Sequence, residues 1–311
     1  METNWDVIIV GGGAAGMSAA QYAARANLNV LLIEEMALGG QGLTIERLEN
    51  YPGLPEPVDG FQFSQNMEKQ AREFGAEILN TSVRSLTKEG NIFKINTGKG
   101  EFTATAVIMA TGAKHRNLGV PGEDTLAGRG ISYCATCDGP FFRGKKMLVV
   151  GGGDAACDEA GFLAKLTDEV VMIHRKDRFR AQPAVAQRVL ENEKIDVRFD
   201  TVAEEIMGED KVSKVRLKNV KTNETVTEDF AAVFIFVGSI PQTALVPDVE
   251  KDEAGYIKTD EKMMTSLPGM FAAGDVRNTP FRQVITSASD GAVAAHWSAH
   301  YIDSLKGQAY V

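Results

Sequence analysis

Cysteine and histidine are scarce in this chain. Its 311 residues include 3 cysteines and 4 histidines. Three cysteines cannot build the disulfide framework that stabilises small secreted proteins. In a reducing compartment, two cysteines as close together as Cys134 and Cys137 are more often catalytic or metal-binding than structural. The scarcity of cysteine therefore directs attention to this one close pair.

Long apolar runs and an excess of basic charge are also missing. No run approaches the roughly 20 apolar residues that a membrane-spanning helix requires. The apolar stretch at residues 7–10 is too short for the core of a secretion signal. The chain has 33 Lys and Arg against 42 Asp and Glu, a net charge of -9, which disfavours general binding to nucleic acid or anionic membrane. We therefore expect a cytoplasmic protein with no nucleic-acid and no membrane partner.

What the chain does contain is an internal repeat. At 311 residues it exceeds the usual domain size of about 100 to 200 residues, so two domains are expected. The segment at residues 7–16, an apolar run followed by glycines and alanines, recurs at residues 147–156. A further apolar run follows each copy, at residues 30–33 and 170–173, as a second strand would. The repeat predicts two βαβ units, one in each of two α/β domains.

The segments around these units also favour two separate domains. Apolar, β-prone runs at residues 102–110 and 230–237 each end near a glycine. Proline and glycine gather at residues 114–122 and 238–247, where we expect the chain to pass from one domain to the other. The last stretch, residues 272–305, predicts a short strand, a loop and a long helix.

The first copy of the repeat has the features of a dinucleotide site. Gly11, Gly13 and Gly16 fit G-x-G-x-x-G between a strand and a helix. Such glycines allow a tight turn, backbone approach to a pyrophosphate and close helix packing, and the helix N-terminus supplies amide donors. A glycine-rich turn alone is weak evidence, but Glu34 also closes the next strand, where a carboxylate accepts from ribose hydroxyls and repels a 2′-phosphate. The first site is predicted to bind an unphosphorylated adenosine ribose, as in NAD or FAD.

The second copy differs from the first in charge. Its loop, Gly151, Gly153 and Ala156, fits G-x-G-x-x-A, and the position equivalent to Glu34 holds His174. The basic residues at and after this position are His174, Arg175, Lys176, Arg178 and Arg180. A basic run is often only a solvated surface, but Arg and Lys at the ribose position grip a 2′-phosphate. The second site is therefore predicted to bind NADPH.

The close cysteine pair, Cys134-Ala135-Thr136-Cys137, is followed directly by Asp138. The sulfurs of a C-x-x-C can close a small ring, which suits reversible disulfide exchange. The alternative is half of a zinc site, but a structural zinc site needs two further ligands at characteristic spacing, and no second cysteine pair exists. NADPH delivers a hydride whereas thiol exchange is ionic, and a flavin can connect the two, so the first site is predicted to bind FAD. Asp138 is the candidate proton donor and acceptor for the thiols.

Taken together, these motifs resemble those of the low-molecular-weight, bacterial type of thioredoxin reductases, in class II of the pyridine nucleotide-disulfide oxidoreductases. The motifs that carry the resemblance are Gly11 to Gly16, Gly39-Gly40-Gln41, Glu49 to Gly53, Ala110-Thr111-Gly112, Cys134 to Gly139, Gly151 to Ala156, His174 to Ala181, Gly274-Asp275-Val276, Arg282-Gln283 and Thr286 to Ala288. The resemblance covers essentially the whole chain, and C-A-T-C-D between the two nucleotide fingerprints is its most discriminating part.

The resemblance implies an α/β fold of two Rossmann-like, three-layer ββα domains. An FAD domain, residues 1–114 and 246–311, is split by an inserted NADPH domain, residues 115–245, which carries the C-x-x-C. A homodimer is also implied. The further cofactor-binding residues implied by matching position are Gly40, Gln41, Asn50, Val83, Ala110, Thr111, Gly112, Gly274, Asp275, Arg282 and Gln283.

The resemblance also implies a direction of electron flow. Cys137 would be the sulfur beside the flavin, Cys134 the thiolate that attacks the thioredoxin disulfide, and Asp138 the acid/base group. The family alternates two domain orientations, and the crossings between the domains would be the hinge. The expected function is the NADPH-dependent reduction of thioredoxin.

The same residues allow three other functions. The chain could serve a peroxiredoxin, but flavoproteins of such systems usually carry an additional N-terminal redox domain. A ferredoxin-dependent variant would not need the second fingerprint and its basic strand end. A redox-sensing module without catalysis would leave Asp138 and the completed FAD site without a role. The sequence therefore favours the NADPH-dependent reductase.

Overall fold

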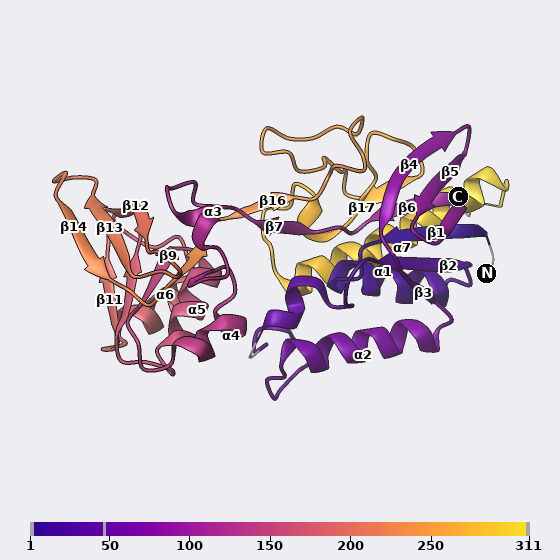
Figure 1. The fold of residues 1–311 in the computed structure, drawn as a ribbon. Coiled ribbons are helices and arrows are strands. Elements are labelled where there is room, and N and C mark those ends of the chain that lie inside the picture. Colours follow the sequence, from indigo (N-terminus) through magenta and orange to yellow (C-terminus); the bar gives the residue numbers. More distant parts are fainter. Residues whose placement is uncertain (1–2, 46–47, 309–311) are drawn as a thin grey trace. The chain divides into compact units, whose positions relative to one another are not determined.

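A computed structural model of the chain describes residues 3–45 and 48–308. The chain divides into two compact units, Met1–Lys114 with Ile240–Val311, and His115–Ser239 (Figure 1). The first unit is discontinuous because the second is inserted into it. The return crossing lies at residues 239/240, whereas the proposed domain boundary is at 245/246.

The first unit is built on a mainly parallel sheet. Its parallel strands lie in the order β3 (Glu77–Asn80), β2 (Val30–Glu34), β1 (Asn4–Val10), β6 (Gly100–Met109) and β17 (Met270–Ala272). The first half of β6 also pairs antiparallel with β5 (Ile92–Thr97), which pairs with β4 (Val83–Glu89). The order of the strands reverses between β1 and β6, and in such sheets ligands bind at the carboxyl ends of the strands at this point.

Alternating side chains of β1 divide the first unit into three layers. Val7 and Ile9 pack in one core with alanines of α1 (Ala14–Arg25) and α7 (Val284–Leu305), to which α2 (Gly60–Glu73) contributes. Ile8 and Val10 pack in a second core with Phe93 of β5. Helices thus cover one face of the sheet and the antiparallel strands contribute to the core on the other, because successive strand residues point to opposite faces.

The second unit repeats this plan. Its parallel sheet has the order β11 (Ile195–Arg198), β10 (Val170–Ile173), β9 (Met147–Gly151), β15 (Ala232–Phe236) and β8 (Ile131–Ser132). One face packs on the antiparallel strands β12 (Thr201–Met207), β13 (Lys214–Asn219) and β14 (Thr225–Asp229). The other face packs on α5 (Asp154–Leu163) and α6 (Pro183–Leu190). Each unit therefore has its own core.

Short elements complete the chain. The crossing segments form β7 (Ala113–His115) and β16 (Ser239–Pro241), which pair with each other. The remaining helical turns are η1 (Gly40–Thr44), α3 (Glu123–Leu126), α4 (Ala135–Asp138), η2 (Gly139–Phe142) and η3 (Gly274–Val276). Within the described residues, no helix combines the length and apolarity needed to cross a membrane. The predicted fold class, two Rossmann-like α/β domains, is confirmed.

Candidate active site and nucleotide sites

The glycine loop of the first unit connects β1 to α1. Gly11 has φ +107°, and a Cβ at this residue would lie 2.3 Å from the Ala110 carbonyl oxygen. A Cβ at Gly16 would lie 1.8 Å from the Gly11 carbonyl oxygen, so α1 packs directly against the loop. By contrast, a Cβ at Gly13 would meet no atom within 4 Å. The loop therefore leaves space before the first turn of α1, which fits a pyrophosphate on the helix amides.

Glu34 folds back onto this loop from the end of β2. Its Oε2 accepts a hydrogen bond from the Gly12 N–H at 2.6 Å, and its Oε1 accepts from the Met36 N–H at 2.8 Å. A carboxylate oxygen has two lone pairs, so each retains capacity for a ribose hydroxyl. Glu34 thus has a second role that the sequence did not indicate, which is to fasten the loop.

Two further pairs of residues that are far apart in sequence are joined by hydrogen bonds, and three of these four residues were predicted. The Asn50 Nδ2 donates to Gln283 Oε1 at 3.0 Å. The Thr111 Oγ1 donates to the Gln242 carbonyl at 2.7 Å, and Gln242 Nε2 donates to the Thr111 carbonyl at 2.6 Å. Gln242 lies in no recognisable motif, so the sequence alone did not indicate it. These pairs hold the segment after β6 and the start of α7 in fixed places within the first unit.

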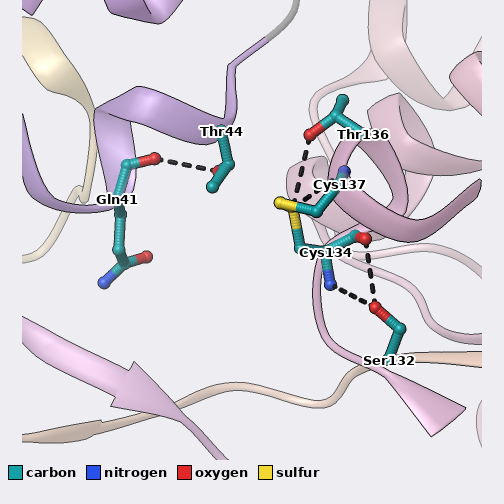
Figure 2. The surroundings of a disulfide bond; sticks show 6 residues. All are labelled: Gln41, Thr44, Ser132, Cys134, Thr136 and Cys137. Atoms are coloured by element: carbon teal, nitrogen blue, oxygen red, sulfur yellow. Dashed lines mark hydrogen bonds between the residues drawn. A yellow bond between two sulfur atoms is a disulfide. The ribbon is translucent and has the colours of Figure 1, made fainter. Parts of the chain in front are cut away.

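Gly40 and Gln41 lie in the 3₁₀ turn that follows β2. The Gln41 side chain donates to the Ala113 carbonyl at 2.6 Å. The backbone carbonyl of Gln41 accepts from the Thr44 hydroxyl at 2.9 Å (Figure 2). Val83 begins β4, just after β3 ends at Asn80. The structure gives these residues defined places, and their contact with FAD stays a prediction.

The Gly274-Asp275 turn is held by a buried ion pair. Asp290 of α7 is 8% exposed, and its Oδ2 accepts from the Gly274 N–H at 3.2 Å and from Arg277 Nη1 at 3.0 Å. The Ser287 hydroxyl donates to Asp275 Oδ1 at 3.3 Å. Burial raises the pKa of the Asp275 carboxyl, and the charge of Arg282 opposes that rise. Arg277 and Asp290 were not predicted from the sequence.

Arg282 lies with its guanidinium 4.0 Å from the ring centroid of Tyr256. Its Nε is buried and has no hydrogen-bond acceptor among the residues that the structure describes. Buried donors are almost always paired, so the unpaired Nε of Arg282, whose charge acts on Asp275, is available to a bound group. This donor and the open space at Gly13 are compatible with a bound FAD.

The glycine loop of the second unit is covered by the basic residues predicted for it. A Cβ at Gly152 would lie 2.3 Å from His174 Nδ1, and one at Gly153 would lie 3.7 Å from Arg180 Nη2. The Arg180 N–H donates to the Gly152 carbonyl at 2.7 Å, which anchors the basic segment over the loop. Arg175, Lys176 and Arg180 are exposed and available to an anionic ligand. This arrangement fits a phosphorylated dinucleotide.

Two residues at this loop, His174 and Asp154, do not add positive charge to it. Burial, followed by the nearby charge of Arg175, lowers the pKa of His174. Asp154 starts α5, and its carboxylate accepts from the N–H of Gln182 at 2.7 Å and from the Gln182 side chain at 3.0 Å. This acid is therefore engaged in fastening the segment before α6.

Cys134 and Cys137 form a disulfide across the single turn of α4. The Cys137 N–H also points at Cys134 Sγ, at 3.2 Å. On the other side, Ser132 Oγ donates to the Cys134 carbonyl at 3.0 Å and accepts from the Cys134 N–H at 3.1 Å, as Figure 2 shows. Cys137 is exposed and Cys134 is half-buried. The pair is thus oxidised, accessible and held by its own loop.

The surroundings of the disulfide include the predicted acid. Asp138 is half-buried, ends α4, and its N–H donates to the Cys134 carbonyl at 3.2 Å. Phe141, three residues further, is 76% exposed. In the described part of the chain, no three His, Cys, Asp or Glu side chains gather in a way that could hold a metal ion. Asp138 thus directly follows the disulfide in the chain, and its role as the acid/base group stays a prediction.

Comparison with known proteins agrees with this chemistry. The sequence profile of the pyridine nucleotide-disulphide oxidoreductase family matches residues 5–296. A thioredoxin reductase of Treponema pallidum (strain Nichols) is 58% identical over 306 residues, which cover 98% of this chain and 100% of that protein. A thioredoxin reductase of Bacillus subtilis (strain 168) is 42% identical over 98% of this chain and 97% of that protein. The crystal structure of Lactococcus lactis thioredoxin reductase (FR conformation) has a TM-score of 0.94 at 43% identity, over 96% of this chain and 99% of that chain.

The chain therefore belongs to the pyridine nucleotide-disulphide oxidoreductase family. Within it, the chain is an oxidoreductase of the thioredoxin reductase type, a flavoprotein with a redox-active disulfide whose cofactors are FAD and NADPH. The resemblance inferred from the sequence motifs is confirmed.

Proposed function

We propose that this protein reduces the disulfide of a thioredoxin with electrons from NADPH. The observation that carries the proposal is the accessible Cys134–Cys137 disulfide in a chain with two nucleotide loops of opposite charge. The names of its full-length relatives indicate thioredoxin as the substrate. The exposed ring of Phe141, four residues after Cys137 in the chain, offers an apolar surface for such a partner to contact.

The proposed chemistry is thiol-disulfide exchange in two steps. In the reduced enzyme, the Cys134 thiolate attacks one sulfur of the thioredoxin disulfide, forms a mixed disulfide and expels the other thioredoxin sulfur as a thiolate. Cys137 then attacks Cys134 Sγ, which releases the second thioredoxin thiolate and closes the Cys134–Cys137 disulfide. The enzyme dithiol is oxidised by two electrons and thioredoxin is reduced by two. Asp138 takes and returns the protons of the thiols.

We assign FAD to the first unit and NADPH to the second. When bound, NADPH would supply a hydride, and FAD would pass its two electrons to the disulfide. The residues proposed to hold FAD are Gly11, Gly13, Gly16, Glu34, Gly40, Gln41, Asn50, Val83, Ala110, Thr111, Gly112, Gly274, Asp275, Arg282 and Gln283. The residues proposed to hold NADPH are Gly151, Gly153, Ala156, His174, Arg175, Lys176 and Arg180.

Cys134→Ser tests the proposal directly. The variant lacks the attacking sulfur, so we expect NADPH to bleach the flavin absorbance as in the wild type, while thioredoxin reduction falls by at least about a thousandfold. Anaerobic stopped-flow absorbance measures the first and insulin turbidity with thioredoxin the second. Cys157→Ser is the matched control and should retain full activity. Thioredoxin reduction by Cys134→Ser at the wild-type rate would refute the assignment.

We further propose a homodimer in a reducing, cytoplasmic compartment. The family resemblance supports the dimer, and the first unit exposes large apolar side chains, among them Met36 at 78% and Phe61 at 59%, that a second copy could cover. Light scattering after size-exclusion chromatography gives the mass. A single-chain mass across micromolar concentrations would contradict the dimer.

A further inference from the structure

A buried carboxylate lies eleven residues before Cys134, outside both nucleotide loops and the C-x-x-C. Glu123, the first residue of α3, is only 2% exposed. Its Oε1 accepts from the Leu118 N–H at 2.8 Å and from the Tyr133 hydroxyl at 2.7 Å, and its Oε2 accepts from the Gly119 N–H at 2.6 Å. A buried carboxylate with three donors is a firm anchor, because removing a donor leaves charge unsatisfied.

Tyr133 is held at its ring as well as at its hydroxyl. The ring stacks on the imidazole of His115, with centroids 3.6 Å apart and planes 13° from parallel. Burial and the hydrogen bond to Glu123 raise the pKa of Tyr133, so the phenol stays protonated and remains a donor. His115 ends β7, so the stack ties the crossing segment at residues 115–123 to Tyr133.

Tyr133 immediately precedes Cys134. Ser132, on its other side, holds the Cys134 backbone through both its N–H and its carbonyl. The attacking cysteine is therefore preceded by two residues whose side chains are both engaged. These contacts do not involve the sulfurs, so they restrain the chain before α4 in both the oxidised and the reduced enzyme.

The restraint matters most after reduction. In the oxidised enzyme the disulfide itself joins Cys134 to Cys137. In the dithiol this covalent link is gone, and the distance between the sulfurs depends on the non-covalent contacts of the loop. Holding two reacting groups near each other raises their effective concentration, which favours ring closure and hence the disulfide.

We propose that Tyr133, clamped between Glu123 and His115, is a positioning residue that holds Cys134 in place in the dithiol form. The proposal rests on the function proposed above. It assigns a role to three residues that lie outside the nucleotide loops and outside the C-x-x-C. Loss of the clamp weakens the disulfide relative to the dithiol and slows the attack of Cys134 on thioredoxin.

Tyr133→Phe in the FAD-loaded enzyme removes the hydroxyl and keeps the ring. The equilibrium constant of the Cys134–Cys137 disulfide is measured in glutathione buffers, by acid quenching, alkylation and mass spectrometry. We expect it to fall about threefold to tenfold, the range that one hydrogen bond contributes. A tenfold fall is a rise in potential of about 30 mV for this two-electron couple. The rate of thioredoxin reduction should fall by a similar factor, while flavin reduction by NADPH stays at the wild-type rate.

Two other variants make the test decisive. Tyr133→Leu also removes the stack and should show a larger effect of the same sign, and the Phe variant stands alone if the Leu variant does not fold. Tyr22→Phe, at an exposed position in α1, is the control and should change nothing. An unchanged potential in Tyr133→Phe, or an equal loss in flavin reduction by NADPH, overturns the proposal. Because the glutathione titration needs no thioredoxin, a wild type that cannot reduce thioredoxin overturns the proposed function instead.

Discussion

At the scale of single residues, the three cysteines of the chain differ in exposure and in bonding. Cys157 is 1% exposed within the core of the second unit, and burial raises its pKa to about 12, so at pH 8 its reactive thiolate is almost absent. We expect iodoacetamide to label no thiol in the native oxidised enzyme, two after reduction, and three after reduction in denaturant. Mass spectrometry counts the labels. Labelling of Cys157 in the native enzyme would contradict the buried position.

His174 gives a prediction about pH. Because its pKa is lowered, the imidazole is mostly neutral at pH 7 and above and adds little charge to NADPH binding there. A bound 2′-phosphate favours the protonated imidazole, so binding takes up a proton at His174, whereas protonation of the 2′-phosphate itself, with a pKa of about 6, weakens binding in wild type and variant alike. We expect the KM for NADPH to be nearly constant from pH 7 to 8.5 and, below neutral pH, to become lower in the wild type than in His174→Asn.

Matched variants separate this effect from that of the permanent charges. His174→Asn lacks the titrating imidazole, so its KM for NADPH should exceed that of the wild type by a growing factor as the pH falls below neutral. Arg175→Ala should raise the KM for NADPH about tenfold at every pH, since a hydrogen bond to a charged group contributes about 1.5–3 kcal/mol, and should leave the KM for NADH unchanged. If the KM for NADPH depended on pH in the same way in the wild type and in His174→Asn, the imidazole would not interact with the 2′-phosphate.

At the scale of elements, the loop between β1 and α1 depends on the end of β2. Glu34 accepts hydrogen bonds from Gly12 and Met36, so Glu34→Ala removes the fastening of the loop together with the proposed ribose contact. We expect the FAD affinity to fall at least about tenfold, consistent with loss of charge-assisted hydrogen bonds. Flavin retained after dialysis measures the loss. The control, Glu35→Ala at the exposed neighbour, should retain its flavin.

At the scale of the whole molecule, the two units have separate cores, so each cofactor should stabilise one of them. A ligand at one hundred times its Kd adds about 2.7 kcal/mol. At about 4–8 °C for each kcal/mol in a domain of roughly 100 residues, this corresponds to a rise in Tm of about 11–22 °C. In scanning calorimetry, NADP⁺ should raise one unfolding transition and FAD the other. Arg175→Ala should lose the NADP⁺ effect and keep the FAD effect, and a loss of both would contradict the assignment of cofactors to units.

The sequence by itself determined the two βαβ units, the strands at residues 102–110 and 230–237, the long C-terminal helix, the fold class, both glycine loops, the charge difference between Glu34 and His174, and the close cysteine pair. It did not determine the antiparallel strands β4, β5 and β12 to β14, or the helices α2 and α6. These features depend on spacing along the chain, because strand and helix periodicity, glycine positions and a C-x-x-C are local patterns. The resemblance to a known family rested on the same local motifs. Element boundaries differed from the structure by only a few residues.

Only the tertiary structure decided which distant side chains meet. The pairing of Asn50 with Gln283, the ion pair of Arg277 with Asp290, and the clamp of Glu123 on Tyr133 each join residues with no shared motif. A hydrogen bond or a buried ion pair forms only when two groups are brought within about 3 Å at a suitable angle. That approach is set by how the layers pack, and spacing in the sequence does not specify it.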